Sequence, residues 1–313
     1  MQSRIVAALV WAIVALSPAA QAFGPFGTAL VAELAQRQLT PQAKAEADRL
    51  LGLIQQREFA VVANWAGNLD KDPQTQALWQ KTRDERFVKY GSDDCLFQPA
   101  RDCADGVCAV AAIERNRATL SDPAAPDQAR IAALLFLMHH VADAHSPLNN
   151  SFKNDQGGYD YAVTVAGKKS NLRQVWDEFL LAFRQQPLKA YADRLAAELP
   201  AAGEPTPASW SQDSCALVRD GDIYPRALSA RRLPDASDAE AGESETSNQE
   251  WQRRGTSSNR SDDLFQKNED SSTVGQRYFK RFTPVAEQQV TLASVRLAQL
   301  LNAALVAGRP QSN

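Results

Sequence analysis

The segment spanning residues 131–149 constrains the fold and the chemistry of this chain more than any other. An apolar run over residues 131–138 leads directly into His139, and Asp143 follows four residues later. On a helix this spacing places an imidazole and a carboxylate on one face, where both can hold one cation. The same spacing is also typical of a hydrogen-bonded core pair. The pattern therefore predicts a buried helix that carries either half of a metal site or a structural polar pair.

Apolar residues recur at intervals of three and four along much of the chain, which predicts a mainly helical fold. One short alternating segment, residues 159–165 followed by Gly167, indicates an arm of a β-hairpin. The sequence contains no internal repeat and no run of coiled-coil heptads. The predicted helical stretches are residues 29–35, 43–54, 131–141, 172–183 and 285–305.

The first 22 residues have the composition of a secretory signal peptide. Arg4 precedes an apolar run over residues 5–16, and Ala20-Gln21-Ala22 is a small-residue cleavage motif. The run is shorter than the ~20 apolar residues that a membrane-spanning helix needs. We therefore expect cleavage after Ala22, a single mature domain over residues 23–313, and a secreted or periplasmic protein without a membrane anchor.

Four cysteines in an exported chain predict two disulfides, and the sequence alone permits three pairings. Residues 236–275 differ from the rest, because they are crowded with small polar and acidic side chains and contain few aliphatic ones. Such a segment cannot offset its ordering entropy by burial. We expect a disordered surface insertion there.

Composition and motifs exclude several other functions. The 34 basic and 37 acidic residues give a net charge of −3, which argues against a general electrostatic attraction to nucleic acid. This net charge is still compatible with a local basic cleft. The glycines lack the flanking pattern of a P-loop or a dinucleotide fingerprint. Only three histidines are present, and no Gly-x-Ser-x-Gly motif accompanies them.

The pattern His139-x-x-x-Asp143-x-x-x-Pro147-Leu148 resembles the motif His-x-x-Gly-Asp-x-x-Gln-Pro-Leu-His of a known family, with Asn149 at the final histidine. That family is the zinc-dependent, single-strand-specific nucleases of the S-one and P-one type, relatives of bacterial zinc phospholipase C. Further matching segments are Phe23-Gly24-Pro25-Phe26-Gly27, Asn64-Trp65-Ala66-Gly67, Asn171-Leu172-Arg173-Gln174-Val175-Trp176-Asp177 and Trp210-Ser211-Gln212-Asp213-Ser214. The resemblance implies an all-α, phospholipase C-like fold with one short β-hairpin and the disulfides Cys95–Cys215 and Cys103–Cys108.

The resemblance also implies a cleft with three zinc ions, and it assigns each ligand position to a residue of this chain. The first set corresponds to Gly67, Lys89, His139 and Asp143, the second to the main chain of Phe23, Thr28 and Asp143, and the third to Asn149, Arg173 and Asp177. Zinc prefers thiolate, imidazole and carboxylate ligands. The residues able to bind metal are therefore His139, Asp143, Asp177 and the Phe23 main chain. The replaced ligand positions are Thr28, Gly67, Lys89, Asn149 and Arg173.

Two of the replacements, Lys89 and Arg173, are fixed cations. An unpaired buried carboxylate is costly, so we expect these cations to form salt bridges with Asp143 and Asp177 that supply part of the charge of zinc. The alternative is that both side chains point into solvent. The resemblance therefore implies reduced zinc occupancy or none.

Two further positions bear on activity. Asp70 stands where the resemblance implies an arginine that stabilises the transition state, and a carboxylate there would repel a phosphodiester. Tyr90 matches an aromatic residue that stacks on a nucleobase, whereas Ser92 replaces the base-reading aspartate; Tyr90 is also consistent with a packed cleft residue.

Two functions follow from these replacements. The first is a catalytically impaired homologue whose cleft binds a nucleotide, a single-stranded nucleic acid, another phosphorylated ligand or a protein partner. The second is an active phosphodiesterase or endonuclease that works with fewer metal ions.

Overall fold

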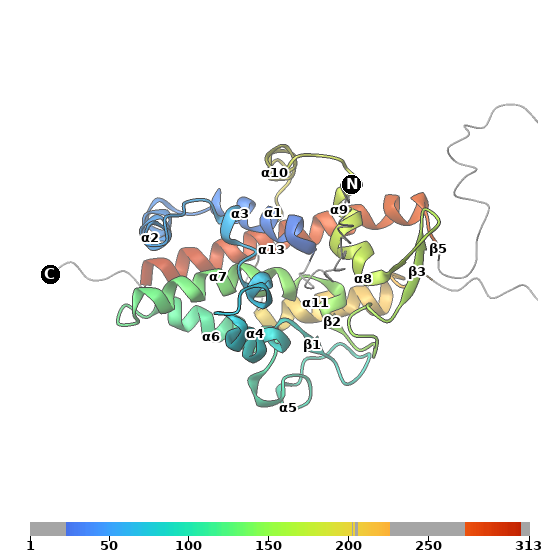
Figure 1. The fold of residues 1–313 in the computed structure, drawn as a ribbon, viewed down its shortest axis with the longest axis horizontal. Coiled ribbons are helices and arrows are strands. Elements are labelled where there is room, and N and C mark those ends of the chain that lie inside the picture. The colour runs from blue at the N-terminus through green and yellow to red at the C-terminus, as the bar shows by residue number, and fades with distance from the viewer. Residues whose placement is uncertain (1–22, 202, 204–205, 226–272, 308–313) are drawn as a thin grey trace, which may run out of the picture.

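Two long helices, α7 (Asp127–Ala144) and α13 (Gln276–Ala307), run through the centre of the computed structural model (Figure 1). The structure describes residues 23–201, 203, 206–225 and 273–307, so the predicted signal peptide lies outside the described residues. Helix α7 is apolar on nearly all sides, which is the pattern of a helix enclosed by others. Its last two turns carry His139 and Asp143 and are therefore buried with the core.

Four helices surround this central pair: α1 (Gly24–Gln36), α2 (Pro41–Gly52), α6 (Ala109–Ser121) and α11 (Pro207–Asp220). Local sequence fixes where several of them begin. The side chain of Thr40 accepts a hydrogen bond from Ala43 N at 3.2 Å, and the following proline fits the first position of α2. Thr206 caps α11 in the same way. The predicted helices at 29–35, 43–54, 131–141 and 285–305 are confirmed as parts of α1, α2, α7 and α13.

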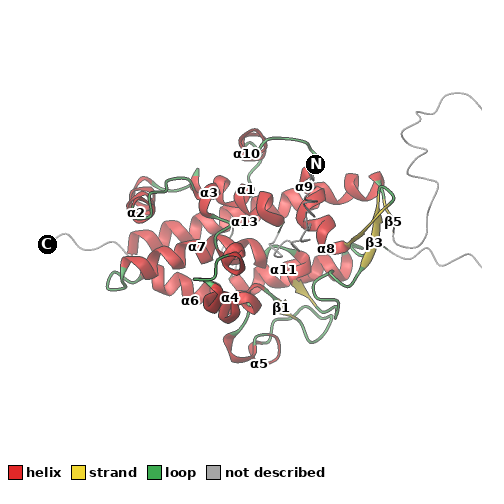
Figure 2. Ribbon diagram, in the orientation of Figure 1, coloured by secondary structure: helices red, strands yellow, loops and turns green. Residues whose placement is uncertain are grey.

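The remaining helical segments are short (Figure 2). The predicted helix at 172–183 is confirmed, but its middle is a π-helical stretch, a feature frequent at functional sites. The segments are α3 (Phe59–Val62), η1 (Ala66–Lys71), α4 (Gln76–Thr82), η2 (Arg83–Arg86), α5 (Pro99–Asp102), η3 (Ala104–Gly106), η4 (Pro147–Asn149), α8 (Leu172–Gln174), η5 (Val175–Phe179), α9 (Leu180–Ala182) and α10 (Leu188–Ala196).

The few strands form two small sheets. The predicted hairpin is confirmed as β3 (Ala162–Val165) and β4 (Lys168–Asn171), joined by a two-residue turn at Ala166 and Gly167 whose φ angles of 48° and 78° suit a type I′ turn. Strand β1 (Val88–Lys89) pairs in parallel with β2 (Asn150–Ser151), and this pairing holds the segment after η2 beside the end of α7.

Strand β5 (Thr273–Val274) pairs in parallel with β3, so the expected disordered insertion over residues 236–275 is wrong at its carboxyl end. Val274 is fully buried, and burial of this one apolar side chain within an otherwise polar segment accounts for the ordered strand. The rest of that segment lies outside the described residues.

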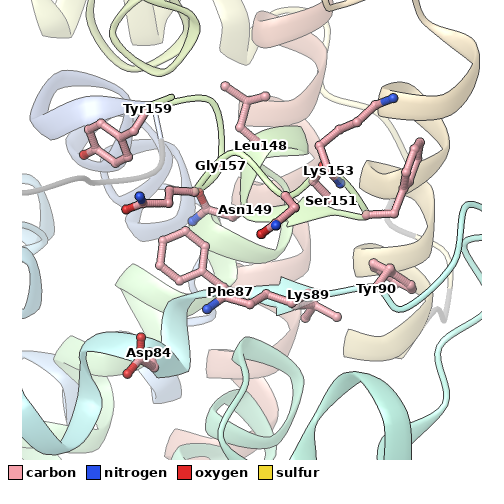
Figure 3. A pocket seen from close by; sticks show the side chains of 14 residues that line it. Asp84, Phe87, Lys89, Tyr90, Leu148, Asn149, Ser151, Lys153, Gly157 and Tyr159 are labelled. Carbon is pink, nitrogen blue, oxygen red and sulfur yellow. The ribbon is translucent and has the colours of Figure 1, made fainter. Parts of the chain in front are cut away.

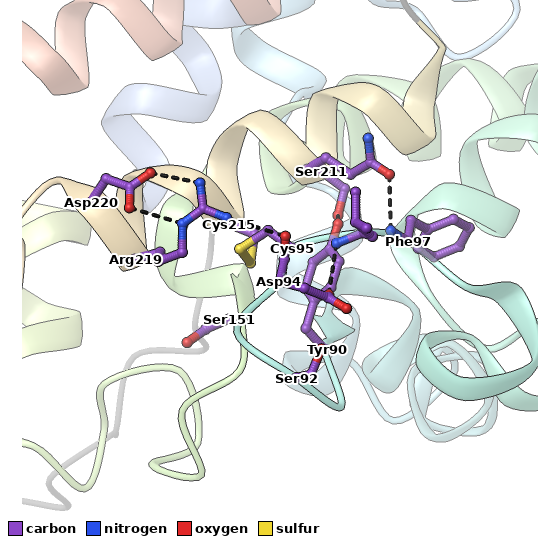
Figure 4. Close-up of a disulfide and its surroundings, with 12 residues drawn as sticks. Tyr90, Ser92, Asp94, Cys95, Phe97, Ser151, Ser211, Cys215, Arg219 and Asp220 are labelled. Carbon is purple, nitrogen blue, oxygen red and sulfur yellow. Dashed lines mark hydrogen bonds and ion pairs between the residues drawn. A yellow bond between two sulfur atoms is a disulfide. The ribbon is translucent and has the colours of Figure 1, made fainter.

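Both implied disulfides are confirmed. Cys95–Cys215 joins the loop after β1 to α11 across 120 residues of sequence (Figure 4). Cys103–Cys108 closes a loop with a separation of only 5. Within the described residues one helix, α13, is long and apolar enough to cross a membrane, but 67% of its apolar window is buried inside the molecule, as in a core helix.

We predict that the two disulfides contribute unequally to stability. A cross-link removes more entropy from the unfolded chain when it closes a longer loop, so replacing Cys95 and Cys215 by Ala should cost about 5 kcal/mol, against about 2 kcal/mol for Cys103 and Cys108. Urea unfolding of the two double variants measures the difference. Equal losses would show that the long cross-link acts mainly on the folded state.

Candidate functional site

The last turns of α7 bring two histidines and one aspartate into the core. His139, His140 and Asp143 are 4%, 1% and 0% exposed. His139 Nε2 lies 3.2 Å from Asp143 Oδ2, and His140 Nδ1 lies 3.7 Å from the same oxygen. The expectation that His139 and Asp143 share a helix face is confirmed.

Asp143 is the centre of a chain of polar contacts that we call the charged row: Arg86, Asp143, Asn149, Arg173 and Asp177. The guanidinium Nη2 of Arg86 lies 3.6 Å from Asp143 Oδ1, and Asn149 Nδ2 donates to that oxygen at 2.5 Å. Arg173 Nη1 donates to Asn149 Oδ1, and Arg173 Nε donates to Asp177 Oδ2 at 2.6 Å. The row thus alternates cations, carboxylates and one amide.

Separate elements supply the members of the row. Arg86 ends η2, Asn149 ends η4, and Arg173 and Asp177 lie four residues apart on the α8–η5 helical segment. All are buried except Arg86, whose side chain is 12% exposed. The row therefore joins segments that are distant in sequence, and each of its charges is largely removed from water.

The first residue of α1, Gly24, lies directly against the backbone of Asp177, at one end of the row. A side chain at Gly24 would place its Cβ 2.2 Å from Asp177 O, so only glycine fits at this approach, where φ is +61°. Phe23, the expected main-chain ligand, is 1% exposed and precedes this glycine. Thr28, on the first turns of α1, donates from Oγ1 to Gly24 O at 3.0 Å.

Burial and neighbouring charge set the protonation of the site. Burial alone would raise the pKa of Asp143, but His139 and Arg86 outweigh it and lower that pKa to about 2. Burial lowers the pKa of His139 to about 3 despite the adjacent carboxylate. Burial raises the pKa of Asp177 to about 6 against the opposing effect of Arg173. At neutral pH the row therefore holds two carboxylates and two guanidinium groups, and the adjacent His139 is neutral.

Lys89 does not join the row, so the expectation of a buried salt bridge from Lys89 is wrong, whereas that for Arg173 is confirmed. The Lys89 side chain is exposed, and its ammonium lies 5.8 Å from the centre of the Phe87 ring. Strand β1 directs Val88 inward and Lys89 outward, because successive side chains alternate. Arg86, three residues earlier, supplies the cation beside Asp143.

The aromatic residue that follows the buried cation is likewise three residues earlier than the sequence implied, Phe87 instead of Tyr90. Tyr90 is 4% exposed, packs among the disulfide cysteines, and its hydroxyl lies 2.8 Å from Ser211 Oγ (Figure 4). Phe87 follows Arg86 directly and is half-buried at a cavity wall. Arg86-Phe87 and Lys89-Tyr90 are both a cation followed by an aromatic residue, and the sequence prediction considered only the second pair. The burial of Arg86 beside Asp143 distinguishes them.

Two cavities adjoin the row. The larger, of about 350 Å³, lies between β1 and the loop after β2, and its walls include Phe87, Lys89, Asn149 and Tyr159 (Figure 3). The smaller, of about 20 Å³, is lined by Gly67, Arg86 and His139 among others. The structure therefore brings together two positions predicted from the sequence, Gly67 and His139, and one that was not predicted, Arg86. Asp70 lies on the same short helical segment as Gly67, η1, and one of its carboxylate oxygens is buried with no partner among the described residues.

An all-helical fold with two disulfides and a buried His/Asp cleft defines a nuclease-like class of protein. The S1/P1 Nuclease family model matches residues 23–306, and the chain belongs to this family. It is 25% identical to Endonuclease 3 of Arabidopsis thaliana over 293 residues, 90% of this chain and 88% of that protein. Nuclease P1 of Penicillium citrinum is 29% identical over 162 residues, 50% and 58% of the two chains. Nuclease S1 of Aspergillus oryzae is 27% identical over 192 residues, 59% and 65%.

The family is zinc-dependent, and the residues present do not fit its zinc centre. His139 and His140 both lie within 4 Å of Asp143, but among the described residues no group of three or more His, Cys, Asp or Glu side chains is arranged so that it could hold a metal ion. Arg86 and Arg173 instead place guanidinium groups within 3.6 Å and 2.6 Å of the two carboxylates. These groups donate hydrogen bonds and cannot ligate a cation.

We predict that Arg173 and Lys89 differ sharply in their contribution to stability. Arg173→Met should lower the free energy of unfolding by about 3 kcal/mol, because it leaves the Asp177 carboxylate buried without a partner. Lys89→Met should leave it unchanged, since that side chain is exposed. Urea unfolding of both variants tests this.

The double variant Arg173→Met/Asp177→Leu is the control, because it removes both charges and should recover most of the loss. A single variant as stable as the unmodified protein would show that the Arg173–Asp177 pair is not buried in solution.

We also predict that the protein loses stability between pH 6 and pH 4. His139 and His145 both have a pKa lowered to about 3, so the unfolded chain binds two protons in this range that the folded chain does not. Asp177 acts in the opposite direction, because its folded pKa of about 6 lies above the unfolded value. These three groups together give a net difference of about one proton, or about 1.4 kcal/mol per pH unit, and the lowered pKa of Asp143 adds to it near pH 4.

Urea unfolding at pH 6, 5 and 4 measures this slope. His145 donates from Nδ1 to Val141 O at 2.7 Å and accepts from Arg296 Nη1 at 2.8 Å, contacts that an uncharged glutamine can partly replace. His145→Gln should flatten the slope in this range. A slope equal to that of the unmodified protein would mean that His145 is already charged in the fold.

Proposed function

We propose that this chain is a non-hydrolysing member of the S1/P1 nuclease family whose charged row occupies the place of the metal centre and whose cleft binds nucleotide-type ligands. The observation that carries this proposal is the pairing of Arg86 and Arg173 with Asp143 and Asp177. Two guanidinium groups supply the countercharge that the carboxylates require after burial.

The chemistry of arginine supports the loss of hydrolysis. A metal ion lowers the pKa of bound water to about 7 and so generates a nucleophile at neutral pH. A guanidinium stays protonated, has no acceptor atom and cannot take a proton from water. His139 is neutral, but its Nε2 lies 3.2 Å from Asp143 Oδ2, and the side chain does not line the larger cavity.

The position of Asp70 points in the same direction. Family resemblance implies an arginine there, and the reversed charge repels the phosphodiester that such an arginine would stabilise. The expected cofactor state is therefore little or no bound zinc. We further propose that the protein is exported, in agreement with its two disulfides, since these persist in oxidising compartments.

We predict that hydrolysis of single-stranded DNA, RNA or a nucleotide 3′-phosphate stays at background, with well under three equivalents of zinc per chain. Restoring the implied ligands and arginine together should raise the zinc content, whereas any one change should do little because the ligands act as a unit. The combined variant carries Thr28→His, Gly67→Asp, Asp70→Arg, Arg86→His, Asn149→His and Arg173→His. Metal analysis and a nuclease assay measure the outcome.

A matched variant with Lys89→His in place of Arg86→His is the control, and it should gain less zinc because Lys89 lies outside the row. Robust zinc-dependent cleavage by the unmodified protein, abolished by Asp143→Asn, would contradict the proposal. It would establish the alternative function, a phosphodiesterase that works with fewer metal ions.

A further inference from the structure

The smaller cavity beside the charged row lies between the end of α7 and the segment that runs through η1, α4 and η2. Helix α4 packs against η1 and η2, and both of these contact α7. A volume of about 20 Å³ holds one water molecule or one small ion. The polar side chains at its walls are those of Trp79, Thr82, Arg83, Arg86, His139 and His140.

The walls of this cavity carry positive charge without a matching negative charge. Among the described residues that line it, two have a guanidinium group and none is Asp or Glu. The ion pairs of both arginines are loose. Arg86 Nη2 lies 3.6 Å from Asp143 Oδ1, which is longer than a hydrogen bond. Arg83 Nε lies 3.7 Å from Asp84 Oδ2, and both of these side chains are more than half exposed.

Arg86 also presents a pair of donors that the row does not use. Its Nε and Nη2 atoms are buried and have no hydrogen-bond partner among the described residues. These two nitrogens form one edge of the guanidinium plane, the fork that binds an anion with two hydrogen bonds. Burial lowers the pKa of Arg86, because the charge of Asp143 offsets only part of the cost of burying the guanidinium.

The two histidines of the cavity leave further nitrogens unpaired. His139 and His140 are 4% and 1% exposed. The Nδ1 atom of His139 and both ring nitrogens of His140 are buried without a hydrogen-bond partner within the described part of the chain. An imidazole carries at least one N–H group in either protonation state, so His140 adds a donor to those of Arg86.

We propose that this cavity is a halide site, that chloride is its ligand, and that the Nε–Nη2 edge of Arg86 is its main donor. The charge of the guanidinium favours an anion over a water molecule, because hydrogen bonds between charged partners are stronger than those between neutral ones. A metal cation does not fit, since a guanidinium has no acceptor atom. Sulfate and phosphate, with five heavy atoms each, are larger than a cavity of about 20 Å³.

The inference rests on the proposed function, because it names the ion that lies beside the charged row in a protein without a metal centre. Two positions of the first implied zinc set, Gly67 and His139, line the cavity. Gly67 leaves the wall without the carboxylate that the resemblance implies there. The sign of the bound charge is therefore reversed at this place, from a cation held by carboxylates to an anion held by a guanidinium.

The experiment measures the melting temperature of the purified full chain in chelator at constant ionic strength, with sodium chloride replacing sodium gluconate. Raising chloride to about 0.2 M should raise the melting temperature by about 3 °C, because a ligand that binds only the folded state stabilises it. Bromide should have a similar effect. Gluconate is far too large for the cavity and provides the chloride-free reference.

Two substitutions at Gly67 test the location of the ion. Gly67→Asp places a fixed carboxylate at the cavity wall, so it should raise the melting temperature without chloride and abolish the response to chloride. Gly67→Asn has the same size without the charge, so it should abolish the response without raising the melting temperature. Lys89→Met is the control for general ion screening, since it removes an exposed cation outside this cavity and should keep the full chloride response.

A crystal of the unmodified protein grown in bromide gives an independent test, which does not depend on the folding of any variant. An anomalous-scattering peak within hydrogen-bond distance of Arg86 Nε and Nη2 is expected. Peaks at exposed lysines only, a melting temperature indifferent to chloride, or a chloride response that persists in Gly67→Asp would each overturn the inference. Failure of the proposed function has a different signature, namely zinc-dependent cleavage in the absence of chelator.

Discussion

Asp143 sits at the end of the central helix with no exposed surface, and the rest of the site follows from the need to neutralise it. A carboxylate in the interior costs several kcal/mol unless a cation and hydrogen bonds compensate. Metal ions do this in the zinc-dependent family to which the chain belongs. Here Arg86 approaches Asp143 from η2, and Asn149 donates a hydrogen bond to it from η4. The positive charge beside Asp143 therefore belongs to a side chain of the protein itself.

Much of the architecture could be predicted from sequence because it depends on local patterns. The apolar run before His139 predicts a buried helix. The four-residue spacing of His139 and Asp143 predicts that both side chains lie on one face of that helix. The hairpin at β3–β4 has a turn whose two residues both adopt positive φ, one of them the glycine identified beforehand. The pairing of Cys95 with Cys215 spans 120 residues and came from family resemblance, not from local physics.

The sequence did not identify the cation beside Asp143, because the prediction named Lys89 and the structure places Arg86 there. Arg86 and Lys89 are each followed by an aromatic residue, and both alignments satisfy the same motif. What separates them is burial, which depends on the pairing of β1 with β2 some sixty residues later in the chain. The ordered strand at 273–274 was missed for the same reason, since its partner β3 lies about a hundred residues earlier. Long-range pairing decides which of two similar local patterns faces the core.

In this chain the guanidinium groups that neutralise the buried carboxylates do not line the larger cavity, so neutralising the carboxylates and contacting a ligand are separate tasks. A metal centre performs both tasks, because the same ion that neutralises the carboxylates also holds the substrate phosphate. In this chain the guanidinium groups are held by Asp143, Asn149 and Asp177, so they contribute little net charge to the larger cavity. The exposed Lys89 side chain lines that cavity, on the outward side of β1. A substitution at Lys89 therefore leaves the buried row intact, whereas a substitution at Asp143 or Arg173 would disturb it directly.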